Sequence, residues 1–165
     1  MSERKQISMY SLLQILQDSL RKKLELLKQV ERKTKEQAEL LLDEDVSLEV
    51  LDRNMDEKAK LIEEISKLDT GFEAMYDSMR RELIRNKEMY KEQIKGIQTY
   101  ISAIMDMSVS IEAIEARNKI AIELLFKNRK KALQHKKAAS SVARQYQKTA
   151  KNLNAVSPQF LDSKK

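Results

Sequence analysis

Apolar residues recur at spacings of three and four through most of this chain, and that periodicity limits what the chain can fold into. The segment from Lys60 to Met79 shows the pattern most clearly, because its apolar side chains would share one face of a helix. The members of this stripe are Leu61, Ile62, Ile65, Leu68, Phe72, Met75, Tyr76 and Met79. Only two glycines and one proline occur in 165 residues, so the chain lacks the turn residues that sheets need. The sequence therefore predicts an all-α protein.

Three such stripes predict three helices, over residues 7–42, 48–83 and 90–126, with the charged side chains of the first helix on other faces. The second helix is expected to begin after Ser47, which would act as its N-cap. No glycine or proline separates the second stripe from the third. We nevertheless expect a turn at residues 85–88, because two long stripes stay uncovered unless a third helix folds back on them.

The expected architecture is an elongated, coiled-coil-like antiparallel three-helix bundle over residues 1–137, followed by a basic, partly disordered C-terminal tail over residues 138–165. Glu115 and Asn118 interrupt the apolar stripe of the third helix, and polar residues at such positions most often fix the register between helices. A ligand site is the alternative interpretation. Gly71 lies inside the second helix, where glycine costs about 1 kcal/mol relative to alanine. We expect a neighbouring helix to pack against it.

The net charge of +6 is unevenly distributed along the chain. Residues 127–165 hold 11 basic residues and one acidic residue, a net charge of +10. The other 126 residues hold 21 basic and 25 acidic residues, a net charge of −4. A basic tail on an acidic body predicts contact with an acidic partner. A solvated tail without a partner is the alternative.

Nothing in the sequence predicts an enzyme, a metal site or a cofactor. His135 is the only histidine, and the lysines that follow it oppose its protonation and metal binding. The loop Asp43-Glu-Asp45 lacks the alternating ligands and the glycine of a calcium-binding EF-hand. The chain has no cysteine, and no apolar run approaches the roughly 20 residues that span a bilayer. We therefore expect a cytoplasmic protein without stable membrane insertion.

Two runs resemble the FlgN-type flagellar export chaperone family. The first covers residues 60–73, where Leu68-Asp-Thr-Gly-Phe-Glu73 matches a Leu-Asp-x-Gly-Phe-Glu-like run that is followed by a tyrosine. The second covers residues 97–104 and 111–118. The resemblance implies a helical cytoplasmic chaperone that binds the amphipathic C-terminal segments of hook–filament junction proteins. It also implies delivery of this cargo to components of the flagellar type III export gate.

Cargo recognition in this family is concentrated in the C-terminal part, which points here to residues 122–153. Apolar contacts would come from Ile122, Leu125, Phe126, Val142, Tyr146 and Leu153. Electrostatic attraction would come from Lys136, Lys137 and Arg144.

Three other interpretations of the sequence stay open. A coiled-coil scaffold or adaptor would use the same stripes for self-association, so a homo-oligomer is possible. A nucleic-acid or anionic-membrane binder would depend on the basic tail, but we expect no nucleic acid because few aromatic residues lie near it. The methionines of the second and third helices are most simply core residues; an adaptable groove that accepts varied helices is the alternative.

Overall fold

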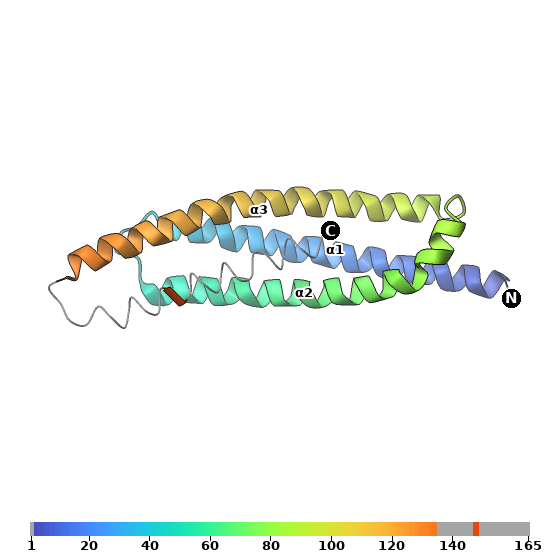
Figure 1. Cartoon of the computed structure of the whole chain (residues 1–165), viewed down its shortest axis with the longest axis horizontal. Helices are drawn as coiled ribbons and strands as arrows, with labels where there is room; N and C mark the ends of the chain where they lie inside the picture. The colour runs from blue at the N-terminus through green and yellow to red at the C-terminus, as the bar shows by residue number, and fades with distance from the viewer. Residues whose placement is uncertain (1, 135–146, 149–165) are drawn as a thin grey trace.

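The computed structural model describes residues 2–134 and 147–148 of the chain. It contains three long helices: α1 (Ser2–Leu40), α2 (Leu48–Arg85) and α3 (Lys91–Ala132), and no strand among the described residues. Short connections join them, so that successive helices run in opposite directions along an elongated bundle (Figure 1). At 1.5 Å per residue each helix is about 60 Å long. The predicted all-α three-helix bundle is confirmed.

Helix α1 supplies the core for both of its neighbours. Its buried positions alternate spacings of four and three without interruption, which is the 3.5-residue period of coiled coils. These positions are Met9, Leu13, Leu16, Leu20, Lys23, Leu27, Val30, Thr34 and Gln37. Helices α2 and α3 both pack against α1, but no Cα atom of α2 lies within 8 Å of one in α3 over the described length of both. The backbones of α2 and α3 therefore lie farther from each other than either lies from α1, and the two helices meet through side chains.

The turn between α2 and α3 covers residues 86–90, close to the predicted position. Asn86 ends α2 by donating both its backbone N–H and its side-chain amide to the Glu82 carbonyl oxygen, each at 3.1 Å. Tyr90 is buried and packs edge-on against Tyr10 of α1, with ring centroids 5.2 Å apart. Burial raises the pKa of Tyr90, with the Glu82 carboxylate as a further cause. An asparagine cap and a buried tyrosine thus form this turn without glycine or proline.

At the opposite end of the bundle, Ser47 occupies the N-cap position of α2, but its side chain makes no capping hydrogen bond. Val46 and Leu51 are both buried in one cluster, as a hydrophobic staple on either side of Ser47 requires. Arg129 of α3 donates hydrogen bonds to the carbonyl oxygens of Glu44 (2.9 Å) and Val46 (2.5 Å). The α1–α2 connection is therefore held by apolar packing and by α3.

A buried polar layer divides the apolar core into two clusters. We define this polar layer as Thr34, Gln37, Asn54, Lys58, Glu115 and Asn118. Lys58 of α2 donates to Glu115 of α3 at 2.5 Å and to Gln37 of α1 at 2.7 Å. Its side chain is 0% exposed. The layer thus joins all three helices at one level.

Asn118 and Glu115 were expected to interrupt the apolar stripe of α3, and both have partners inside the bundle. Asn118 donates to the Thr34 carbonyl oxygen (2.9 Å) and to Gln37 (3.1 Å), while the Thr34 hydroxyl donates to Glu115 (3.2 Å). A shift of α3 by one turn would separate these groups and leave them buried without partners. The geometry therefore agrees with a role in register.

We expect Lys58→Met to lower the free energy of unfolding by about 3 kcal/mol, because it leaves the Glu115 carboxylate in the core without its cation. Lys58→Met combined with Glu115→Leu should recover most of this loss. Urea denaturation followed by circular dichroism measures both. Lys67→Met is the matched control, since the Lys67–Glu63 pair is exposed and should change stability by less than about 0.5 kcal/mol. Equal effects at Lys58 and Lys67 would contradict the role of the layer.

The stability of the chain should also depend on pH through Lys58. Desolvation lowers the pKa of Lys58 below its ordinary value of 10.5, although the nearby Glu115 opposes the shift. Between the lowered pKa and 10.5 the unfolded chain binds more protons at this group than the folded chain, so stability rises with pH there. Urea titrations across this interval should show a steeper rise for the wild type than for Lys58→Met. Parallel curves would contradict the lowered pKa.

The expectation for Gly71 is wrong. Gly71 is exposed, and a Cβ atom added to it would meet nothing within 4 Å. The second glycine does lie at a close approach, because a Cβ atom on Gly96 would come within 3.0 Å of the Gln17 side-chain nitrogen. The apolar stripe around Gly71 faces α1 and the space beside it, and the glycine itself falls on the opposite face.

We expect Gly71→Ala to raise the free energy of unfolding by about 0.5–1 kcal/mol, because it removes backbone freedom from the unfolded chain and adds no clash. Gly96→Ala should give a smaller gain, since its methyl group must displace Gln17. Thermal unfolding of the two variants beside the wild type tests this. A lower midpoint for Gly71→Ala would contradict the open surface at this position.

Candidate functional site

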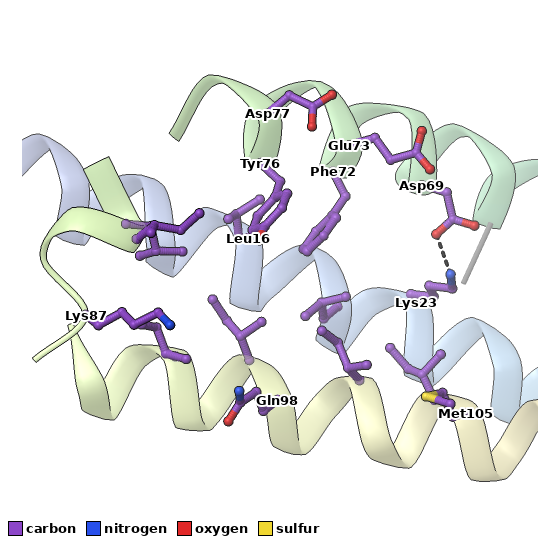
Figure 2. A pocket seen from close by; sticks show the side chains of 17 residues that line it. Leu16, Lys23, Asp69, Phe72, Glu73, Tyr76, Asp77, Lys87, Gln98 and Met105 are labelled. Carbon is purple, nitrogen blue, oxygen red and sulfur yellow. Dashed lines mark hydrogen bonds and ion pairs between the residues drawn. The ribbon is translucent and has the colours of Figure 1, made fainter. Parts of the chain in front are cut away.

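An apolar groove lies between α2 and α3, with α1 as its floor (Figure 2). Its volume is about 620 Å³. The α1 floor consists of Leu16, Leu20 and Lys23. This groove follows from the fold, because α2 and α3 both pack on α1 while their own Cα atoms stay more than 8 Å apart.

The α2 wall of the groove is aromatic. Phe72 and Tyr76 are one helical turn apart, and their rings stack with centroids 6.2 Å apart and planes 7° apart. Figure 2 shows both rings directed from α2 into the space above α1. Leu83 and Ile84 extend this wall towards the α2–α3 turn.

The α3 wall is aliphatic and partly open to solvent. Ile94, Ile97 and Ile104 line it next to the core, whereas Ile101 and Met105 are 38% and 51% exposed. Side chains at these spacings share one face of a helix. The exposed members therefore form a second apolar edge beside the buried stripe of α3, with no helix covering it among the described residues.

Charged side chains stand along one edge of the groove. Asp69 forms an ion pair with the buried Lys23 across the α1–α2 contact (Figure 2). Glu73 and Asp77 follow Asp69 at intervals of one turn on α2, and neither forms an ion pair with a described residue. Lys87 lines the groove near the α2–α3 turn. The α2 edge is therefore acidic and the α3 edge is not.

The residues expected to bind a partner lie elsewhere. Ile122 and Leu125 are buried at the opposite end of the bundle, in one cluster with Val46, Leu51 and Met55, and Phe126 packs against that cluster. A partner would reach Ile122 and Leu125 only after this end of the bundle opened. The other expected residues lie outside the described part of the chain: Lys136, Lys137, Val142, Arg144, Tyr146 and Leu153.

One feature of the sequence, an extra pair of apolar residues beside the main stripe of α3, could have indicated the groove. Ile101 and Met105 repeat at a spacing of four, beside the buried series that contains Ile97 and Ile104. A second apolar edge of this kind widens the apolar face beyond what one neighbouring helix can cover. Met105 also agrees with the adaptable-groove interpretation of the methionines, whereas Met55 and Met79 are core residues.

The described residues contain no group of three or more His, Asp or Glu side chains placed to hold a metal ion. None of the described helices combines the length and apolar character that crossing a membrane requires. The arrangement is one that can bind apolar surface and discriminate charge along one edge.

Comparison with protein-family models, with curated proteins and with solved structures found no match to this chain. Arguments about function therefore depend on the groove and on the residues that line it.

Proposed function

We propose that this chain is a chaperone that binds an amphipathic helix of a partner protein in the groove between α2 and α3. The observation that carries the proposal is an apolar channel open to solvent whose two walls and floor are themselves helices. A helix in this channel would lie on α1 and cover the apolar edges of α2 and α3, as a fourth helix does in a four-helix bundle.

The length of the groove suits a short helix. Its α2 wall extends from Asp69 to Ile84 and its α3 wall from Ile94 to Met105. At 1.5 Å per residue these walls are about 22 Å and 16 Å long, which corresponds to three or four helical turns of a partner. Each large apolar side chain that the partner buries there would contribute about 1.5–3 kcal/mol.

Some of the residues that carry the resemblance to FlgN-type chaperones line this groove. Asp69, Phe72 and Glu73 of the first resembling run line the α2 side of the groove together with Tyr76, the tyrosine that follows this run, while the second run supplies Ile97, Ile101 and Ile104. On this support we propose C-terminal segments of hook–filament junction proteins as the cargo. The chain would mask their apolar faces in the cytoplasm and deliver them to the flagellar type III export apparatus.

Moderate affinity would suit this role. A disordered cargo segment loses conformational entropy when it becomes helical in the groove, and that loss offsets part of the apolar contact energy. The groove is also partly open, so the partner keeps one face in solvent. Both features favour release of the cargo without a second ligand.

We expect Ile101→Asp to weaken binding of a junction-protein C-terminal peptide at least about tenfold, because it places a carboxylate on the apolar contact surface. Isothermal titration calorimetry measures the affinity. Ile120→Asp is the matched control: it changes the same residue type on α3 at a position that is 66% exposed and outside the groove. Ile120→Asp should bind like the wild type. Equal binding by all three proteins would contradict the groove as the site.

Truncation of the chain after Ser140 tests the groove without most of the basic tail, because the groove lies wholly within residues 16–105. The shortened chain should keep its affinity within about threefold of the full chain. Complete loss of binding would place recognition in the tail instead, with Val142 and Tyr146 as its apolar contacts. A concentration-independent oligomer of the free chain in sedimentation experiments would favour the scaffold interpretation.

A further inference from the structure

The acidic edge of the groove indicates which helices it accepts. We infer that the groove selects an amphipathic helix whose α2-facing edge carries lysine or arginine at positions one turn apart. This inference rests on the proposed function, and it specifies the chemistry of the partner rather than the existence of the site. It follows from three features of the charged side chains around the groove.

The first feature is the position of the acidic residues. Asp69, Glu73 and Asp77 repeat every four residues on α2, and all three line the groove beside the aromatic wall. Residues four apart lie on successive turns of one side of a helix, in a row inclined to its axis, so the carboxylates run from the largely buried Asp69 to the exposed Glu73 and Asp77 at the edge of the groove (Figure 2). Basic side chains four apart on a parallel or antiparallel partner helix have the same spacing as this row.

The second feature is that the fold neutralises one end of the row only. Lys23 pairs with Asp69, and both side chains are largely buried in the α1–α2 contact. Glu73 and Asp77 are exposed and form no ion pair with a described residue. Glu73 and Asp77 repel each other as like charges one turn apart on a helix. The exposed Arg80 and Arg81, within one turn of Asp77, offset only part of this repulsion because they lie more than one turn from Glu73. Partner cations would remove this repulsion.

The third feature is the difference between the two edges. On the α3 side the exposed lining residues of the helix are Gln98, Ile101 and Met105, none of which carries a charge, and the exposed Lys87 of the α2–α3 turn adds one positive charge at that end of the groove. A bound helix would therefore find a negative edge on one side and a neutral, apolar edge on the other. This asymmetry favours one rotation of the partner about its axis, with its basic flank towards α2.

The strength of the selection follows from the exposure of these groups. Glu73 and Asp77 lie at the solvent-facing edge, where single ion pairs are weak and screened by salt. Two pairs together are expected to change affinity by about tenfold at low salt, and by less at high salt. The apolar contacts would supply most of the affinity, and the acidic edge would supply the preference between partners.

The test uses the full chain and two synthetic amphipathic peptides of about 18 residues, or five helical turns. Both peptides have the same apolar face; one carries lysine and the other glutamate along one flank. Titration calorimetry at low salt should show about tenfold tighter binding of the lysine peptide, and the difference should shrink in 0.5 M salt, to the order of a few-fold. Equal affinities for the two peptides would overturn the inference and leave the proposed groove function standing. Failure of both peptides to bind would overturn both.

Charge reversal assigns the preference to the acidic edge. Glu73→Lys combined with Asp77→Lys should reverse the preference, so that the glutamate peptide binds more tightly. The control is Asp56→Lys combined with Glu112→Lys, which changes the net charge equally at exposed positions outside the groove. The control should keep the preference for lysine. A similar reversal in the control would overturn the inference, because the effect would then follow from net charge alone.

Two other occupants of the groove would give distinct results. A chain that ends at Ser140 and binds the lysine peptide at least about tenfold more tightly than the full chain would show that the basic tail already fills the groove. A dimer that dissociates when the lysine peptide is added would show that a second copy fills it. Either result would overturn the assignment of the acidic edge to an external partner.

Discussion

The ion pair between Lys58 of α2 and Glu115 of α3 is the interaction on which the arrangement of this bundle depends. It joins α2 to α3 directly, and both groups also bond to α1 through Gln37 and Thr34. A charge pair in the core is stable only when its geometry and further hydrogen bonds offset its desolvation. The layer supplies such hydrogen bonds, while Nε2 of Gln37 and Oδ1 of Asn54 have no partner among the described residues. The bonds that it makes favour one alignment of the three helices along the axis.

The polar layer also separates two parts of the bundle with different properties. Towards the α1–α2 connection, Val46, Leu51, Met55, Ile122 and Leu125 close the core, and Arg129 holds the connecting loop. On the other side of the layer, α2 and α3 diverge around α1 and leave the groove between Phe72, Tyr76, Ile101 and Met105. One end therefore has a closed core, and the other end leaves apolar surface open to solvent.

This division bears on how a chaperone of this shape would work. The groove is bounded by helices that are formed in the chain without a partner, so little ordering of the chain itself would be needed on binding. The partner supplies the ordering, which keeps its affinity moderate. The acidic edge on α2 then discriminates among helices that have equally apolar faces. The basic tail lies largely outside the described residues, and the groove gives no information about it.

The sequence by itself determined the three helices, the position of the α2–α3 turn and the polar positions Glu115 and Asn118, because these follow from local periodicity and from interruptions in it. The tertiary structure decided that α1 is the helix against which both α2 and α3 pack. Periodicity shows that a face is apolar, but it does not show which neighbour covers that face, so the groove beside Ile101 and Met105 could not be predicted from the stripes. For the same reason Gly71 was expected to face a neighbouring helix, and it faces solvent. The burial of Lys23 and Lys58 could not be predicted for the same reason. A lysine can be buried in a helix interface only where another helix places a carboxylate next to its ammonium group. That placement is a property of the folded bundle.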